Sequence, residues 1–196
     1  IIGRLVGSEM CIRDSGNINL SADSSIMFGN ERFISRIGVK NLFVGDSSGF
    51  SNSNGNNNTF VGYIAGRDNL FGNQNTFIGS ETGVVNSAGS MNTFVGRRAG
   101  YSNTIATENT FLGAYAGQNN TEGWHNSFLG VTTGSYNTTG SENSFLGAHA
   151  GYLNSEGSFN TFVGNFAGIT NVLGNFNTTL GFEADVSAAS FNNATA

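Results

Sequence analysis

The chain has 196 residues and a formal net charge of −5, and only 11% of its residues are charged, against about 25% in an average globular protein. Residues 101–196 contain no lysine or arginine, so the basic face that a nucleic-acid-binding protein needs is not expected. No apolar run reaches the roughly 18 residues of a membrane-spanning helix, and the single cysteine, Cys11, excludes a disulfide framework.

The first segment, residues 1–15, has nothing in common with the rest of the chain. The stretch Leu5-Val-Gly-Ser-Glu-Met-Cys-Ile-Arg-Asp-Ser15 resembles the translated sequencing-adaptor peptide that contaminates some environmental assemblies. We therefore expect residues 1–15 to be a non-native, unstructured segment that replaces the native amino terminus, and we exclude it from the fold prediction as one excludes a tag.

From Asn41 onward the sequence repeats with a fixed period of 17 residues. Asn58-Thr-Phe-Val-Gly returns as Asn75-Thr-Phe-Ile-Gly and Asn92-Thr-Phe-Val-Gly, and the series decays at Asn177-Thr-Thr-Leu-Gly. The unit reads Asn-[Thr/Ser]-Phe-[Val/Ile/Leu]-Gly-x-x-[Ala/Thr/Ser]-Gly-x-x-Asn-x-x-Gly-x-x, and its positions are numbered 1 to 17 below. A short fixed period is typical of solenoids, in which each repeat is one rung and only stacked rungs bury a core.

The residue types of the unit predict β structure. Thr, Phe and Val favour strands, Gly brackets them where turns need a positive φ, and a two-helix repeat would need more than about 30 residues. We predict an all-β parallel β-solenoid, of the β-roll or β-helix type, with about ten rungs of 17 residues. Residues 16–40 would form a degenerate first rung or cap, 41–181 the regular array, and 182–196 a decayed and truncated last rung.

Position 3 of the unit predicts an internal aromatic ladder. Side chains alternate between the two faces of a strand, so the phenylalanines at position 3 point away from positions 2 and 4. At an inter-strand spacing of about 4.8 Å the rings would stack inside the coil, together with the small residues of position 8. The predicted ladder consists of Phe43, Phe60, Phe77, Phe94, Phe111, Phe128, Phe145 and Phe162.

Asparagine occupies position 12 in every rung from Asn52 to Asn171. Stacked asparagines hydrogen-bond along the axis and to neighbouring backbone, so this column is expected to be structural. A column of metal ligands is less favoured because amide oxygens alone are a poor ligand set. No metal site and no cofactor is predicted.

Positions 2 and 4 would lie on the outside of the coil. The aliphatic column at position 4, from Val61 to Val163, forms a contiguous stripe that usually marks a partner surface, and a parallel cyclic homotrimer is the predicted way to cover it. The alternative is a flat array of Thr-x-Val triplets that faces water or ice. The column that would form this partner or ice-binding face is Thr59, Thr76, Thr93, Thr110, Ser127, Ser144, Thr161 and Thr178.

No catalytic residue is predicted, and the chain is not expected to be an enzyme. Gly45-Asp-Ser-Ser-Gly49 matches the Gly-x-Ser-x-Gly nucleophile elbow, but these residues are positions 5 to 9 of the repeat and lack the strand–turn–helix context. His125 and His149 occupy different columns and are expected at the surface, away from any carboxylate partner.

Aromatic residues outside position 3 raise the alternative of a glycan-binding groove. Because they do not form one column, we expect scattered surface residues instead. They are Tyr63, Tyr101, Tyr115, Trp124, Tyr136, Tyr152 and Phe166.

Three stretches carry a resemblance to known proteins: the Asn-Thr-Phe-Val-Gly-x-x-Ala-Gly units, the opening from Glu31 to Gly45 and the closing from Ala184 to Ala196. They resemble the repetitive shafts of bacterial and phage tail-fibre-like surface proteins, in which an endosialidase-type chaperone domain commonly follows. They are also similar to the left-handed parallel β-roll heads of trimeric autotransporter adhesins, although the unit here is longer and leaves the handedness open.

The resemblance implies a non-enzymatic, extracellular shaft or adhesin segment, on a cell surface or a virion fibre. Its expected partners are copies of itself in a homotrimer and a cell-surface glycan or receptor. The alternative function is an ice-binding β-solenoid that uses the Thr/Ser column.

Overall fold

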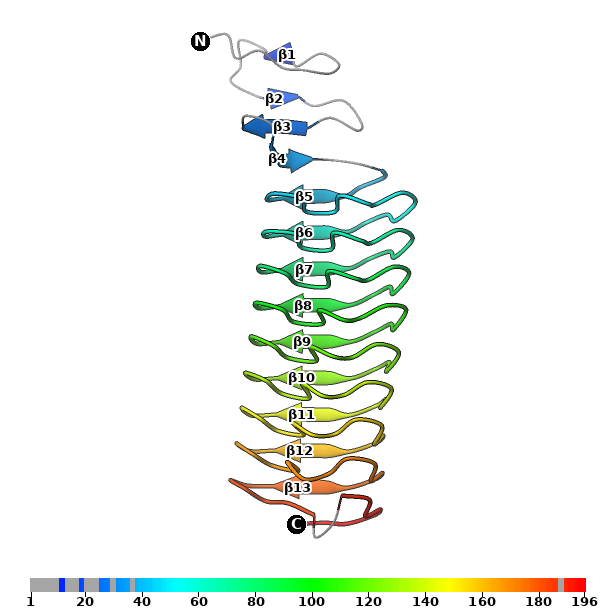
Figure 1. Cartoon of the computed structure of the whole chain (residues 1–196), viewed down its shortest axis with the longest axis vertical. Helices are drawn as coiled ribbons and strands as arrows, with labels where there is room; N and C mark the ends of the chain where they lie inside the picture. The colour runs from blue at the N-terminus through cyan, green and yellow to red at the C-terminus, as the bar shows by residue number, and fades with distance from the viewer. Residues whose placement is uncertain (1–10, 13–17, 20–24, 29–30, 36–37, 187–188) are drawn as a thin grey trace.

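The repeat array coils into an elongated stack with one short strand per turn (Figure 1). None of the described residues lies in a helix, and the fold is the parallel β-solenoid that the 17-residue period predicts. The computed structural model describes residues 11–12, 18–19, 25–28, 31–35, 38–186 and 189–196.

Nine three-residue strands occupy positions 2 to 4 of successive repeats, and eight parallel pairings join them. Each residue pairs with its equivalent one repeat later, as Phe94 does with Phe111. The strands are β5 (Leu42–Val44), β6 (Thr59–Val61), β7 (Thr76–Ile78), β8 (Thr93–Val95), β9 (Thr110–Leu112), β10 (Ser127–Leu129), β11 (Ser144–Leu146), β12 (Thr161–Val163) and β13 (Thr178–Leu180).

The amino-terminal end of the sheet is antiparallel. Strand β3 (Ser25–Phe28) pairs antiparallel with β4 (Glu31–Ser35), which pairs antiparallel with β5. Two residues separate β3 from β4, which is a hairpin-length connection, whereas parallel strands need a full crossover. The described residues thus form nine parallel strands where about ten rungs were predicted, and an antiparallel pair precedes them within the segment predicted as a degenerate first rung or cap.

Only two residues of the segment 1–15 are described. Cys11–Ile12 form β1, which pairs antiparallel with β2 (Ile18–Asn19) in a two-stranded sheet separate from the array. The remainder of the predicted non-native segment lies outside the described residues.

The phenylalanines of position 3 form the core, as predicted. From Phe43 to Phe162 none exposes more than 1% of its surface, and neighbouring rings stack with centroids 4.7–4.9 Å apart and planes within 12° of parallel. Glycine at position 9 makes room for them, since a Cβ on Gly117, which has φ 55°, would collide with the Phe111 ring. Burial of each ring contributes about 1.5–3 kcal/mol to stability.

Two buried asparagine columns complete the interior. At position 1, Asn126 Oδ1 accepts the backbone N–H of Asn143 at 3.0 Å, while its Nδ2 donates to the Gly140 carbonyl at 2.8 Å. At position 12, Asn137 Nδ2 donates to Asn120 Oδ1 at 2.7 Å and to the same Gly140 carbonyl at 2.8 Å. Because buried polar groups are costly unless paired, these amides lock each rung to the next. The structural interpretation of the position 12 column is confirmed.

One methyl group disturbs this ladder. Position 15 is glycine in the seven other rungs between Gly55 and Gly174, but it is alanine at Ala106. The Cβ of a residue at position 15 faces the amides of two successive position 12 asparagines. Next to Ala106 the hydrogen bond from Asn120 Nδ2 to Asn103 Oδ1 is 3.2 Å long, whereas the equivalent bonds elsewhere measure 2.6–2.9 Å.

Candidate functional site

The predicted Thr/Ser column lies on the outer face of the sheet. Its first four members, Thr59 to Thr110, are half-buried, and its last four, Ser127 to Thr178, are exposed. Within the described residues, the hydroxyls of this column donate no hydrogen bond to another residue. They are therefore free to bind water or a partner.

The aliphatic column of position 4 runs beside it. Its Ile and Leu members are exposed, whereas Val61, Val95 and Val163 are half-buried. Ile78 exposes 40% of its surface and Leu146 exposes 51%. The two columns lie on strands in strict parallel register, one rung apart at each step. The outer sheet face thus presents one row of hydroxyl residues beside one row of aliphatic residues.

A second column of hydroxyl residues, at position 13, behaves differently and was missed in the sequence analysis. Thr121 Oγ1 donates to the Thr138 carbonyl at 3.1 Å, and Thr138 Oγ1 donates to the Ser155 carbonyl at 2.9 Å. These hydroxyls form hydrogen bonds between rungs. The sequence could have indicated this column, because position 13 is Ser or Thr in six of the rungs.

Position 16 has a similar structural role. The side chain of Ser158 accepts the backbone N–H of Ser141 at 3.0 Å, and Asn175 Oδ1 accepts that of Ser158 at 2.8 Å. The hydroxyl and amide groups of these two columns are thus largely engaged in contacts between rungs.

Two corners of each rung hold non-glycine residues in the left-handed region. They are positions 7 and 17, where φ lies between 48° and 61°, even at the β-branched Ile64 and Thr132. This conformation costs L-residues roughly 1–2 kcal/mol. Residue types at these two positions differ from rung to rung, so charged and aromatic side chains occur there only in particular parts of the rod.

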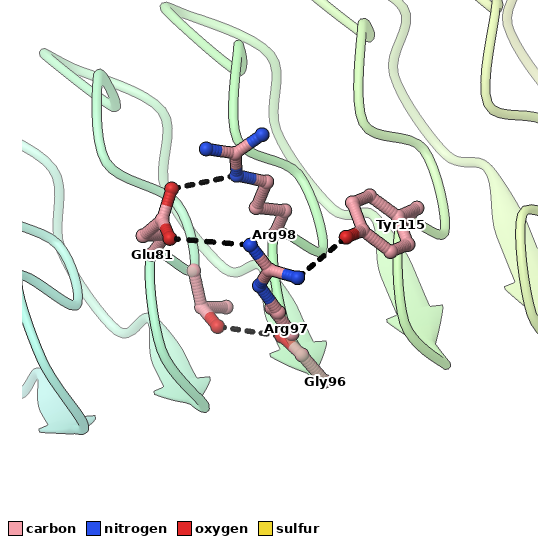
Figure 2. A network of polar contacts seen from close by, with 6 residues as sticks. Glu81, Gly96, Arg97, Arg98 and Tyr115 are labelled. Atoms are coloured by element: carbon pink, nitrogen blue, oxygen red, sulfur yellow. Dashed lines mark hydrogen bonds and ion pairs between the residues drawn. The ribbon is translucent and has the colours of Figure 1, made fainter.

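The corner of rungs three to five carries a charged network (Figure 2). Arg98 Nε donates to Glu81 Oε2 at 2.6 Å, while Arg97 Nη2 lies 3.8 Å from Glu81 Oε1. The hydrogen bond to Glu81 raises the pKa of Arg98 above its ordinary value. Arg97 Nη1 also donates to the Tyr115 hydroxyl at 2.7 Å, and its guanidinium lies 5.5 Å from the centre of the Tyr115 ring.

His125 does have a carboxylate partner, contrary to expectation. Its Nε2 lies 2.6 Å from Glu108 Oε2, because the two residues occupy position 17 of adjacent rungs. Trp124 packs edge-on against His125 at 4.5 Å. The 17-residue spacing was the signal that could have found this pair.

The aromatic residues on the side of rungs five to eight are not scattered. Tyr136 and Tyr152 meet edge to face with ring centres 5.0 Å apart. His149 stacks on Phe166 at 4.8 Å and lies 5.7 Å from Tyr152. His149 lies in a turn and is half-buried where an exposed residue was expected, and its Nδ1 is buried without a hydrogen-bond partner.

A shallow groove of about 580 Å³ lies on this side of the rod. Three tyrosines line it: Tyr115, Tyr136 and Tyr152. Tyr115 joins the groove to the charged network of Figure 2. Three of the aromatic residues that the sequence analysis expected to be scattered thus line one groove.

The structure bears on two of the candidate chemistries raised by the sequence, a metal site and a serine nucleophile. The described residues contain no group of three or more His, Cys, Asp or Glu side chains placed to hold a metal ion. Ser47 of the Gly-x-Ser-x-Gly match lies in the turn after β5, and its Oγ donates to Asp46 Oδ1 at 3.0 Å. No helix among the described residues is long and apolar enough to cross a membrane.

Comparison with known protein families, with curated proteins and with solved structures found no match to this chain.

Proposed function

We propose that the chain is a non-enzymatic structural shaft, a segment of an extracellular fibre-like surface protein that assembles with copies of itself and carries adhesive contacts. The observation that carries this proposal is the unbroken stack of nine strands in one register. Each added repeat extends the rod by one rung without changing its cross-section, which is what a spacer requires.

The contacts in the interior support a mechanical role, in which the rod keeps its shape under force. The phenylalanine stack and the two asparagine columns run through the regular rungs, so each rung is tied to its neighbours by aromatic contacts, side-chain amides and backbone hydrogen bonds. Such an array resists bending because no single rung is held by one interaction alone.

The outer sheet face supports self-assembly. Leu112, Leu129 and Leu146 are exposed members of an aliphatic column that runs the length of the array, and its valines are half-buried. Contiguous exposed apolar surface is typical of interfaces. Three parallel copies around one axis would cover this column with an equivalent surface of each neighbour, as closed rotational symmetry requires.

Light scattering on the purified chain tests the assembly. The wild type should have the mass of a trimer, and Leu112→Glu together with Leu129→Glu should reduce it to a monomer, because charge would be buried at the interface. Val131→Glu is the matched control, since Val131 is 50% exposed but lies outside the strands. A monomeric wild type would contradict this part of the proposal.

Ice binding is the second candidate, and the free hydroxyls of the Thr/Ser column favour it. These hydroxyls repeat at the rung spacing on the outer sheet face, where they could order water. The wild type should then be monomeric and show thermal hysteresis. Thr93→Tyr with Thr110→Tyr should abolish the hysteresis without unfolding the rod, and a wild type without hysteresis would exclude this function.

A further inference from the structure

The tyrosine-lined groove has a clear origin in the sequence. Its middle rung, the sixth, carries Thr132 at position 7 and Ser135 at position 10. The adjacent rungs carry larger residues at these positions: Tyr115 and His149 at position 7, and Gln118 and Tyr152 at position 10. Short side chains between longer ones leave a depression one rung wide, and all of these residues except His149 line it.

Uncharged polar groups share the groove with the rings. Gln118 and Asn119 line it, and their side-chain amides make no hydrogen bond within the described residues. Thr132 and Ser135 also line it. Ser135 is almost fully buried, and Thr132 Oγ1 donates to the Val131 carbonyl at 2.7 Å, so this hydroxyl remains only as an acceptor. No charged residue lines the groove. The site therefore offers free donors and acceptors beside aromatic surface.

The rings that form the walls are held in place before any ligand arrives. Arg97 fixes Tyr115 through the 2.7 Å hydrogen bond to its hydroxyl (Figure 2). Tyr136 packs against Tyr152, and His149 supports Tyr152 from behind. Interaction with the Tyr136 hydroxyl raises the pKa of Tyr152 above its ordinary value. Fixed side chains reduce the entropy lost on binding.

We infer that this groove is a binding site for a neutral oligosaccharide. The negative face of an aromatic ring attracts the C–H face of a pyranose, and free amides pair with its hydroxyls. A volume of about 580 Å³ falls within the range of ligand sites. The inference rests on the proposed shaft function and names the ligand class of its adhesive contact.

The test titrates the purified chain with maltohexaose, cellohexaose, mannohexaose and a galactan hexasaccharide, followed by calorimetry and amide chemical shifts. At least one should bind, with shifts confined to residues around the groove. Tyr136→Ala with Tyr152→Ala should weaken binding at least about tenfold. Tyr63→Ala is the matched control, because Tyr63 is as exposed as Tyr136, at 54% against 49%, yet lies outside the groove.

A second variant, which fills the groove, tests whether a loss of binding could be caused by misfolding. Thr132→Tyr places at position 7 a residue that the preceding rung already holds there in the same left-handed conformation, at Tyr115. It should abolish binding while unfolding at an unchanged temperature.

The inference would be overturned if none of the probes binds at a concentration of about 5 mM, which corresponds to a weaker affinity than the roughly 1 mM Kd of a weak complex. Stronger binding of a sialylated oligosaccharide would overturn it as well, since the site would then select charge. The mass of the same sample reports on the shaft separately. A trimer that binds no glycan overturns only the groove, and a monomer that binds one overturns only the assembly.

Discussion

The interior of this coil and its corners differ in how residue types recur from rung to rung. Inside, Phe at position 3 and Asn at positions 1 and 12 recur because each must meet an identical residue one rung away. Outside, the corner positions hold Glu81, Arg98 and Tyr115 in successive rungs. Repetition at the buried positions therefore follows from packing between rungs, whereas the corner residues differ from rung to rung. The outer sheet face is the exception, because its residues repeat and are partly exposed.

The largest expected effect comes from deleting one ring of the ladder. Phe111→Ala should destabilise the rod by about 3–5 kcal/mol through lost burial and a cavity between two stacked rings. Phe71→Ala removes the same side chain from a position that is 53% exposed and should change stability by less than about 0.5 kcal/mol. Denaturant unfolding measures both, and equal effects would break the distinction between inside and outside.

Deleting one buried amide should come next. Asn126→Ala leaves the N–H of Asn143 and the carbonyl of Gly140 with one partner fewer, at a cost of about 2–4 kcal/mol. Asn165→Ala is the control, because Asn165 is exposed and its side chain makes no hydrogen bond in the described structure. A neutral Asn126→Ala would mean that water replaces the ladder.

The two hydroxyl columns sharpen the comparison. Thr121→Val removes the hydrogen bond to the Thr138 carbonyl and should cost about 0.5–1.5 kcal/mol. Thr110→Val preserves shape on the outer sheet face and should leave the melting temperature unchanged, since its hydroxyl bonds to no other residue. Should the two variants lose the same stability, the outer column is not free for a partner.

The smallest effect concerns pH. Arg67 lies 2.6 Å from Asp68, and the hydrogen bond from Arg67 lowers the pKa of Asp68 below its ordinary value of 3.8. A carboxyl with a depressed folded-state pKa contributes stability above its unfolded pKa and loses it as the pH falls through the folded value. Because both side chains are exposed, the contribution is at most about 0.5 kcal/mol. Asp68→Asn should flatten the dependence of stability on pH below 4 by that amount, as measured by thermal unfolding in acid.

The sequence predicted the fold because its strongest signal is the packing itself. The burial of Phe94 or Phe111 follows from period and alternation alone. The antiparallel β3 and β4 were missed because no repeat unit marks residues 25–35. The tyrosine groove was missed for a different reason: Tyr115, Tyr136 and Tyr152 occupy positions 7, 11 and 10, which become neighbours only when the turn folds.

Ala106 affects how the rod should respond to a force along its axis. The rungs of a solenoid contact only their neighbours, so a tensile load along the axis passes through every junction in series. The bond between Asn103 and Asn120 is the longest of the position 12 ladder, whereas the Phe94–Phe111 contact at the same junction is as close as the others. Under such a load we therefore expect the asparagine ladder to open first between the fourth and fifth rungs.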